Sequence, residues 1–148
     1  MPVGAARSRQ GMRAVADTNV LVAAAIAPNG LCGRLLLEAV ADRWQLVVSP
    51  ALMTELGDVL ERPKFRRWLS TVEATRFAVG VGGLAEVVAD PASSAVRRTP
   101  DPDDEFLIAL ARAAGVAALI SGDAHLTAVV GLVPPVLTPA AFLAQIVA

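Results

Sequence analysis

Short apolar runs alternate along the chain with longer stretches in which apolar residues recur every three or four positions. The short runs predict buried strands, and the longer stretches predict amphipathic helices. The expected strands span 13–17, 45–49, 85–89, 116–121 and 135–137, and the expected helices span 31–40, 50–61, 65–69, 71–84, 102–114, 123–130 and 139–146. Strands and helices therefore alternate from one end of the chain to the other.

This alternation predicts an α/β fold. Strands that are apolar throughout and separated by helices are typical of a parallel sheet covered on both faces. We therefore expect a three-layer α/β/α sandwich with a central, mainly parallel sheet of about four to five strands. Ligands bind such sheets beyond the carboxyl ends of the strands, so functional side chains are expected there.

The helix over 102–114 has the clearest boundaries in the sequence. Asp101 and Pro102 provide an N-cap followed by proline at the first helical position, and Gly115 is a suitable C-cap. The polar segment 90–100 before this helix is expected to be a loop.

Composition favours one globular domain. Of 148 residues, 55% are hydrophobic and 18% are charged, and we expect the domain over 12–148, with residues 1–11 as an N-terminal extension. The uncharged stretch 18–33 contains Asn, Pro and Gly, which argues against a membrane span. The first residues lack the features of a secretory signal, and Cys32 is the single cysteine, so we expect a cytoplasmic protein with no membrane partner.

The charge balance limits the classes of partner. A net charge of −1 and a pI near 5.8 argue against a protein that coats nucleic acid by electrostatic attraction alone. A divalent cation held by clustered acids would nevertheless cancel negative charge where a phosphate must lie. The positions of the acids therefore matter more than their number.

Two aspartates lie where the predicted sheet places a site. Asp17 ends the first strand, and Asp123 follows the strand over 116–121. A carboxylate at the end of a buried strand is costly to desolvate unless it binds a cation or accepts hydrogen bonds. The alternative for Asp17 is a turn-forming residue that leads into Thr18.

Glu55 is a third candidate, from the helix over 50–61. It falls on the same side of this helix as Leu52 and Val59, at the edge of the apolar face. The alternative is an ordinary surface acid that faces solvent or a partner four residues away.

The segment DPDDE supplies further acids at the start of the helix over 102–114. Acids in the first helical turn complement the helix dipole and need no other function. Asp104 nevertheless shares a face with Leu107 and Ile108, so we expect it to point toward the sheet edge. Asp101 and Asp103 are expected to be exposed.

Together these carboxylates suit a hard cation. Oxygen ligands from acids favour Mg²⁺ or Mn²⁺ over zinc or copper. Such cations support phosphodiester hydrolysis without a covalent nucleophile, because they polarise the phosphate and lower the pKa of a bound water. The residues expected to serve both in catalysis and as metal ligands are Asp17, Glu55, Asp104 and Asp123.

Clustered cations are the candidate contacts for a phosphate backbone. Four lie within six residues and two more lie in the expected loop: Arg62, Lys64, Arg66, Arg67, Arg97 and Arg98. The alternative is that an arginine-rich composition merely reflects coding bias. Aromatic residues make up 4% of the chain, so a broad base-stacking platform is not expected. His125 is expected to be a surface or capping residue.

Five segments resemble the PIN-domain family in their order and spacing. They are DTNVLVAA (17–24), TELGDVL around Glu55, DDEFLIALA (103–111), LISGDAHL (119–126) and LTPAAFLA (137–144). Within that family the chain is most similar to VapC-related toxins, in which the helix after the glutamate often ends in a segment like RPKF at 62–65.

The resemblance implies a Mg²⁺- or Mn²⁺-dependent endoribonuclease that cleaves single-stranded RNA and serves as the toxin of a type II toxin–antitoxin pair. It implies an acidic quartet and two supporting polar residues: Asp17, Glu55, Asp104 and Asp123, with Asn19 and Ser121. The implied partners are the RNA, a small cognate antitoxin and a second copy of the chain in a homodimer.

Two other functions use similar residues. A regulatory module would hold a metal ion or RNA in the same acidic pocket without cleaving it. A phosphotransfer enzyme with an aspartyl nucleophile is less consistent with the sequence. A phosphatase of the haloacid-dehalogenase type needs a second acid where Asn19 stands. Both this class and a receiver domain need a catalytic lysine late in the chain, whereas Lys64 is the only lysine.

Overall fold

The computed structural model describes residues 12–92, 101–129 and 131–147. The strands in these ranges are β1 (Arg13–Ala16), β2 (Gln45–Val48), β3 (Glu86–Val87), β4 (Ala118–Ile120) and β5 (Val136–Leu137). The helices are α2 (Thr18–Ile26), α3 (Leu31–Val40), α4 (Pro50–Leu60), the 3₁₀ helix η1 (Pro63–Phe65), α5 (Thr71–Leu84), α6 (Pro102–Ala114), α7 (Ala124–Thr127) and α8 (Pro139–Val147). The expectations for 1–11 and for most of 90–100 concern residues outside the described ranges.

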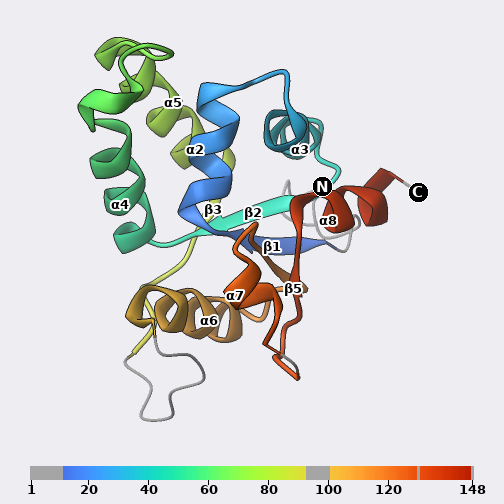
Figure 1. Ribbon diagram of the computed structural model, residues 1–148. Helices are drawn as coiled ribbons and strands as arrows, with labels where there is room; N and C mark the ends of the chain where they lie inside the picture. The colour runs from blue at the N-terminus through green and yellow to red at the C-terminus, as the bar shows by residue number, and fades with distance from the viewer. Residues whose placement is uncertain (1–11, 93–100, 130, 148) are drawn as a thin grey trace, which may run out of the picture.

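The strands form one sheet in which every neighbouring pair is parallel, in the order β3-β2-β1-β4-β5. In Figure 1, helices α2, α3, α4 and α5 lie above the sheet and α6 lies below it. Helix α6 contacts β1 and β4 directly. The structure confirms the predicted α/β sandwich around a parallel sheet.

The strand order reverses between β1 and β4. The chain adds β2 and then β3 on one side of β1, whereas β4 and β5 lie on its other side. At such a reversal the connections leave the two strands toward opposite faces, which opens a crevice at their carboxyl ends. Asp17 directly follows β1 and Ser121 directly follows β4, so both residues border this crevice.

Helix α2 is an element that the apolar pattern does not predict. Six of its nine residues are buried: Thr18, Val20, Leu21, Val22, Ala24 and Ala25. Because α2 contacts both α3 and α4 as well as lying over the sheet, most of its circumference is buried and no polar stripe marks a helical period.

Among the described residues no single helix has both the length and the apolar composition to cross a membrane; α2 and α3 reach that threshold only as a pair, bent by 98°.

Several other predicted elements are shorter than expected or differ in type. Instead of a helix over 65–69, the chain forms η1 followed by turns, and α7 ends at Thr127, four residues before Gly131 with its positive φ of 81°. Strands β3 and β5 have two residues each. Both are edge strands with a neighbour on one side only, so fewer backbone hydrogen bonds hold them extended.

Helix α8 is fixed to the rest of the domain by an aromatic pair. The ring centroids of Trp44 and Phe142 lie 5.1 Å apart at 74°, in an edge-to-face arrangement. The indole N–H of Trp44 donates to the carbonyl of Leu35 at 2.8 Å. Phe142 is fully buried, so the predicted last helix is confirmed and forms part of the core.

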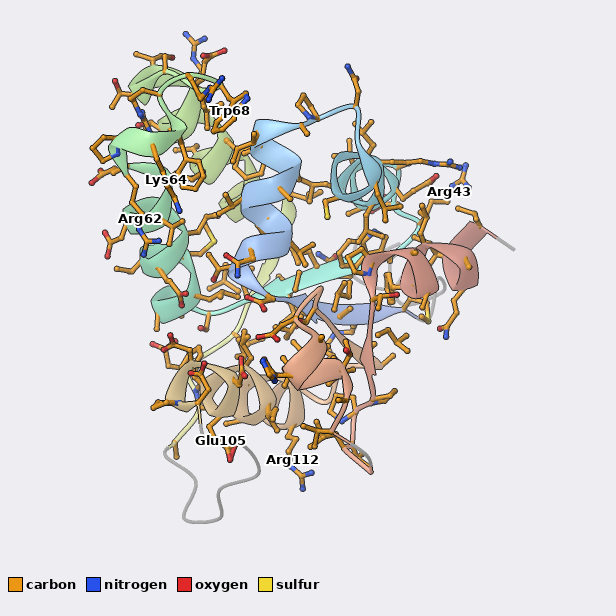
Figure 2. The ribbon with its side chains drawn as sticks, viewed as in Figure 1. Arg43, Arg62, Lys64, Trp68, Glu105 and Arg112 are labelled. Atoms are coloured by element: carbon orange, nitrogen blue, oxygen red, sulfur yellow. The ribbon has the colours of Figure 1, made fainter. Side chains whose placement is uncertain are left out.

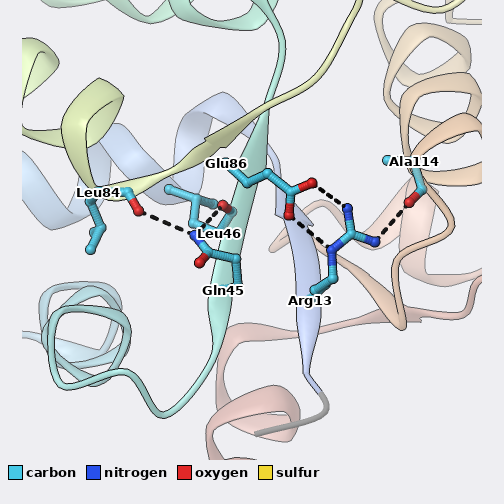
Figure 3. Close-up of polar contacts among 6 residues, drawn as sticks. All are labelled: Arg13, Gln45, Leu46, Leu84, Glu86 and Ala114. Atoms are coloured by element: carbon cyan, nitrogen blue, oxygen red, sulfur yellow. Dashed lines mark hydrogen bonds and ion pairs between the residues drawn. The ribbon is translucent and has the colours of Figure 1, made fainter. Parts of the chain in front are cut away.

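Arg13 holds the amino end of the sheet (Figure 3). Its guanidinium donates to both carboxylate oxygens of Glu86 at 3.0 and 2.9 Å, and to the carbonyl of Ala114 at 2.8 Å. These bonds link β1 to β3 across β2, and link both to the last turn of α6. Since the Arg13 and Glu86 side chains are 34% and 43% exposed, their ion pair adds little stability. The bond to the carbonyl of Ala114 ties the last turn of α6 to the sheet; the first turn of the same helix carries Asp104.

Candidate functional site

Asp17, Ser121 and Asp123 are joined by hydrogen bonds at the carboxyl ends of β1 and β4. The hydroxyl of Ser121 donates to Oδ2 of Asp17 at 3.0 Å, and the backbone N–H of Asp123 donates to Oγ of Ser121 at 3.0 Å. Ser121 is fully buried. This buried hydroxyl therefore links the side chain of Asp17 to the backbone of Asp123, beyond the ends of two neighbouring strands.

Asp17 also begins α2 as its N-cap. Its Oδ1 accepts the backbone N–H of Asn19 at 3.3 Å. The pKa of Asp17 is raised above 3.8, first because burial disfavours the charged form and also because of the charge of Asp123; the bonds from Asn19 and Ser121 act in the opposite direction. Asp17 therefore has the local capping role that the sequence offers as an alternative. The same carboxylate also lies close to the negative charge of Asp123.

Helix α6 brings Asp104 to the same crevice. Asp104 is 8% exposed, on the buried face of the helix as predicted. Burial is the first cause that raises its pKa to about 6, and the charges of neighbouring acids come next: Asp101, Asp123, Asp17 and Asp103. Within the described ranges its carboxylate makes no hydrogen bond. A desolvated acid among other negative charges is a favourable place for a cation.

Asp101 and Asp103 are exposed, as predicted. Asp101 is the N-cap of α6, and its Oδ1 accepts the backbone N–H of Asp103 at 2.8 Å. Asp103 has an effect that the sequence does not predict, because its charge raises the pKa of Glu55 on α4. The first turn of α6 therefore reaches α4 electrostatically.

Glu55 borders the crevice from α4. Glu55 as a whole is exposed to solvent. Partial burial of its carboxylate is nevertheless the first cause that raises the pKa of Glu55, and the negative charges of Asp103 and Asp17 raise it further. The hydroxyl of Thr18 and the positive charge of Arg62 oppose the rise. Glu55 therefore belongs to the same electrostatic cluster as Asp17, at its more exposed side.

The four predicted acids supply the oxygen donors that Mg²⁺ or Mn²⁺ prefers. Among the described residues, no three acidic, histidine or cysteine side chains are arranged to enclose one ion. Mg²⁺, however, keeps several waters and commonly takes one or two protein carboxylates together with substrate phosphates. The donor set fits an ion of this kind, which one or two of the predicted ligands Asp17, Glu55, Asp104 and Asp123 would hold while water completes its coordination.

Three of the predicted phosphate contacts, Arg62, Lys64 and Arg67, are exposed near the junction of α4, η1 and α5. We call these three residues the basic surface. Figure 2 labels Arg62, Lys64 and the neighbouring Trp68. The ammonium of Lys64 lies 5.1 Å from the centroid of the Phe65 ring, and the guanidinium of Arg67 lies 4.8 Å from that of Trp68. The positive charges are therefore interleaved with aromatic rings.

The other predicted cations do not extend this surface. Arg66 is half-buried and donates to the carbonyl of Leu60, so its guanidinium is directed into the protein. Arg97 and Arg98 lie outside the described residues. His125 is exposed, and its backbone N–H donates to Oδ1 of Asp123 at 2.8 Å, which agrees with a surface position in a capped helix.

Two residues of the cluster were not among the predicted site residues. Thr18 is buried and its hydroxyl lowers the pKa of Glu55, and Asp103 raises it. The position of Thr18 directly after the N-cap Asp17 was the available signal, since it places the hydroxyl in the first turn of a helix. For Asp103 the sequence offers no such signal, because its neighbour on α4 is set by tertiary packing.

The protein is thus an α/β sandwich whose acids gather where the strand order of the sheet reverses. A family profile described as PIN domain matches residues 13–125. This chain belongs to the PIN-domain family.

Individual proteins are similar to this chain to different degrees. The uncharacterized protein MJ1680 of Methanocaldococcus jannaschii is 27% identical over 115 residues, which cover 78% of this chain and 73% of that relative. The crystal structure of PAE2754 from Pyrobaculum aerophilum matches with a TM-score of 0.67 at 18% identity. The match covers 92% of this chain and 90% of the PAE2754 chain. The structure of VapBC2 from Rickettsia felis, bound to a DNA fragment from their promoter, has a TM-score of 0.60 at 14% identity and covers 86% and 98%. At these identities the two structures show a shared fold.

Proposed function

We propose that this PIN-domain protein is a Mg²⁺- or Mn²⁺-dependent endoribonuclease that cleaves single-stranded RNA. The observation that carries the proposal is the electrostatic cluster at the β1–β4 crevice. There Asp17 and Asp104 both have a raised pKa, and the charge of Asp123 contributes to each. Such a cluster is unfavourable in the free protein and becomes favourable when a cation is bound.

The acidic residues of the crevice have different roles in this proposal. Ser121 links the carboxylate of Asp17 to the backbone of Asp123, and Asp104 approaches from the other face of the sheet. Glu55, at the exposed side, is the acid best placed to accept a proton from water. A bound divalent cation supplies polarisation of the scissile phosphate and offsets the negative charge of the acids.

The basic surface supports a single-stranded substrate. Arg62, Lys64 and Arg67 provide positive charge for phosphates, and the half-exposed Trp68 offers a ring face for a base. The charge of Arg62 also reaches Glu55, so a strand that contacts this surface is led toward the acids. A flexible strand can follow such a path more readily than a stiff duplex.

The test is cleavage of a labelled RNA that contains one single-stranded and one double-stranded segment. We expect cuts in the single-stranded segment with Mg²⁺ or Mn²⁺, and none after chelation. The matched control is the double variant Asp17→Asn, Asp123→Asn, which keeps the size of both side chains. Calorimetry should show weaker metal binding by this variant than by the wild type.

Equal metal binding by the two proteins would refute the assignment of these ligands. Metal binding by the wild type without any cleavage would instead support a regulatory module that holds metal or RNA in the acidic pocket.

We further propose that the protein is the toxin of a type II pair, restrained by a small antitoxin, and that it forms a homodimer. The shared fold with VapBC2 from Rickettsia felis supports this proposal, as does the acidic crevice, which would accept a basic side chain from a partner. Expression without a partner should arrest growth, whereas the Asp17→Asn, Asp123→Asn variant should be tolerated. Harmless expression of the wild type would contradict the toxin role, and its mass in solution tests the dimer.

A further inference from the structure

A cavity of about 390 Å³ opens beside the acidic crevice. It lies between α2, the start of α3, the segment after β4 and the start of α8, and its lining residues are Asn19, Val20, Ala23, Cys32, Gly122, Asp123 and Pro139. The cavity shares Asp123 with the candidate active site. Its volume is in the range of pockets that hold small organic groups.

The walls of this cavity suit an uncharged group that has both apolar surface and polar atoms. Val20, Ala23 and Pro139 provide apolar surface, whereas Asn19 and Asp123 provide polar atoms. The amide of Asn19 makes no hydrogen bond elsewhere in the described part of the chain, so both its donor and its acceptor are available. A Cβ added at Gly122 would meet no atom within 4 Å, which leaves room on that side.

On the basis of the proposed function, we propose that this cavity holds one nucleobase of the RNA, next to the phosphate that is cleaved. A nucleotide whose phosphate lies in the neighbouring acidic crevice has its base tethered within reach of the cavity. The phosphate itself is disfavoured inside, because Asp123 is the one charged residue in the lining. No aromatic ring lines the cavity, so apolar contact and hydrogen bonds to the base edge replace stacking. The protein should therefore prefer certain bases at one position beside the cut.

Cys32 allows occupancy of the cavity to be measured without any cleavage. It lines the cavity and is the only cysteine in the chain, so alkylation by iodoacetamide, followed by mass spectrometry, reports on this position alone. Burial raises the pKa of the Cys32 thiol, so the reaction is best run at mildly alkaline pH. Nucleosides and nucleoside 5′-monophosphates should slow alkylation, whereas ribose 5-phosphate, which lacks the base, should not.

A substitution that fills the cavity provides the second measurement. Ala23 is exposed on α2 and lines the cavity, so Ala23→Phe should place a ring where the base would lie. We expect KM for RNA to rise about tenfold with little change in kcat, which corresponds to a loss of about 1.4 kcal/mol of binding. Protection of Cys32 by nucleosides should also disappear. The matched control is Ala113→Phe, an exposed alanine on α6 outside the cavity, which should behave as the wild type.

Three results would overturn the nucleobase site. They are an absence of protection by any nucleoside, equal protection by ribose 5-phosphate, and a failure of Cys32 to react at all in the free protein, which would mean that the cavity is closed. The two proposals fail separately. Protection of Cys32 in a protein that cleaves no RNA refutes the ribonuclease, and cleavage by a protein whose Cys32 is never protected refutes the base site.

Discussion

Ser121 and Asp17 lie 104 residues apart in the chain and share a hydrogen bond of 3.0 Å between neighbouring strands. The bond joins a fully buried hydroxyl to a carboxylate at the reversal of the strand order. Because the same hydroxyl accepts the N–H of Asp123, one small side chain connects the two central acids of the site.

We expect Ser121→Ala to lower both stability and activity. The loss of two partly buried hydrogen bonds should cost about 1 to 3 kcal/mol of the free energy of unfolding. The bond from Ser121 lowers the pKa of Asp17, so its removal should raise that pKa and move the acidic limb of the pH–activity profile to higher pH. Ser121→Thr keeps the hydroxyl and serves as the control. An unchanged acidic limb in Ser121→Ala would show that Asp17 does not need its charge.

Asp104→Asn should stabilise the metal-free protein while abolishing cleavage. The pKa of Asp104 is raised from 3.8 to about 6 in the folded state, so the folded state binds the extra proton and stability falls as pH rises through this window. At pH 7 the variant should gain about 1 to 3 kcal/mol, where the upper value converts the whole pKa shift. The gain should shrink as pH falls and vanish below about pH 3, where the Asp104 carboxyl is protonated in both the folded and the unfolded wild type.

Thermal unfolding of Asp104→Asn across this pH range provides the measurement, with Asp58→Asn, at an exposed aspartate of α4, as the control. A variant that stays active, or whose stability gain is independent of pH, would contradict the role given to Asp104.

Asp101→Ala should have the opposite effect. Loss of the N-cap of α6 should cost about 0.5–2 kcal/mol, because the N–H of Asp103 loses the acceptor that now lies at 2.8 Å. Much of the activity should remain, since Asp101 is exposed and is not expected to bind metal. Melting temperature and cleavage rate, measured together, separate the two aspartates; a stable but inactive Asp101→Ala protein would exchange their roles.

Gly33→Ala should destabilise the protein strongly, whereas Gly80→Ala should not. A Cβ at Gly33 would lie 2.5 and 2.7 Å from the carbonyl carbon and Cα of Pro28, and closer still to its carbonyl oxygen. At Gly80, which is exposed in α5, a Cβ would meet nothing within 4 Å, so alanine should stabilise the helix by about 0.5–1 kcal/mol. Urea unfolding of the two variants tests this contrast, and a tolerated Gly33→Ala would mean that the turn before α3 can move.

The sequence predicts those parts of the fold that depend on local pattern. The apolar run of β1 and the capped helix α6 are both visible in the residues themselves, and Gly115 does end α6 with a positive φ of 65°. Helix α2 is not predicted, because a helix buried around most of its circumference has no polar stripe.

The same distinction applies to the site. Asp17 and Asp123 are predictable as neighbours, because the carboxyl ends of parallel strands meet at one edge of a sheet. The influence of Asp103 on Glu55 is not predictable, since it depends on where α4 and α6 lie in space. Arg66 shows the same limit, because the direction of a long side chain follows from packing rather than from its position among other cations.

The pairing of β1 with β4 also governs when the acidic site can exist. These strands are neighbours in the sheet although β2, β3 and the helices between them separate the two in the chain. A growing polypeptide on the ribosome exposes Asp17 early, but it lacks Ser121 and Asp123 until synthesis has passed β4. The chain through Asp123 must therefore be synthesised before these acids can assemble, so shorter nascent chains lack the acidic site and, under the proposed function, any RNA cleavage that depends on it.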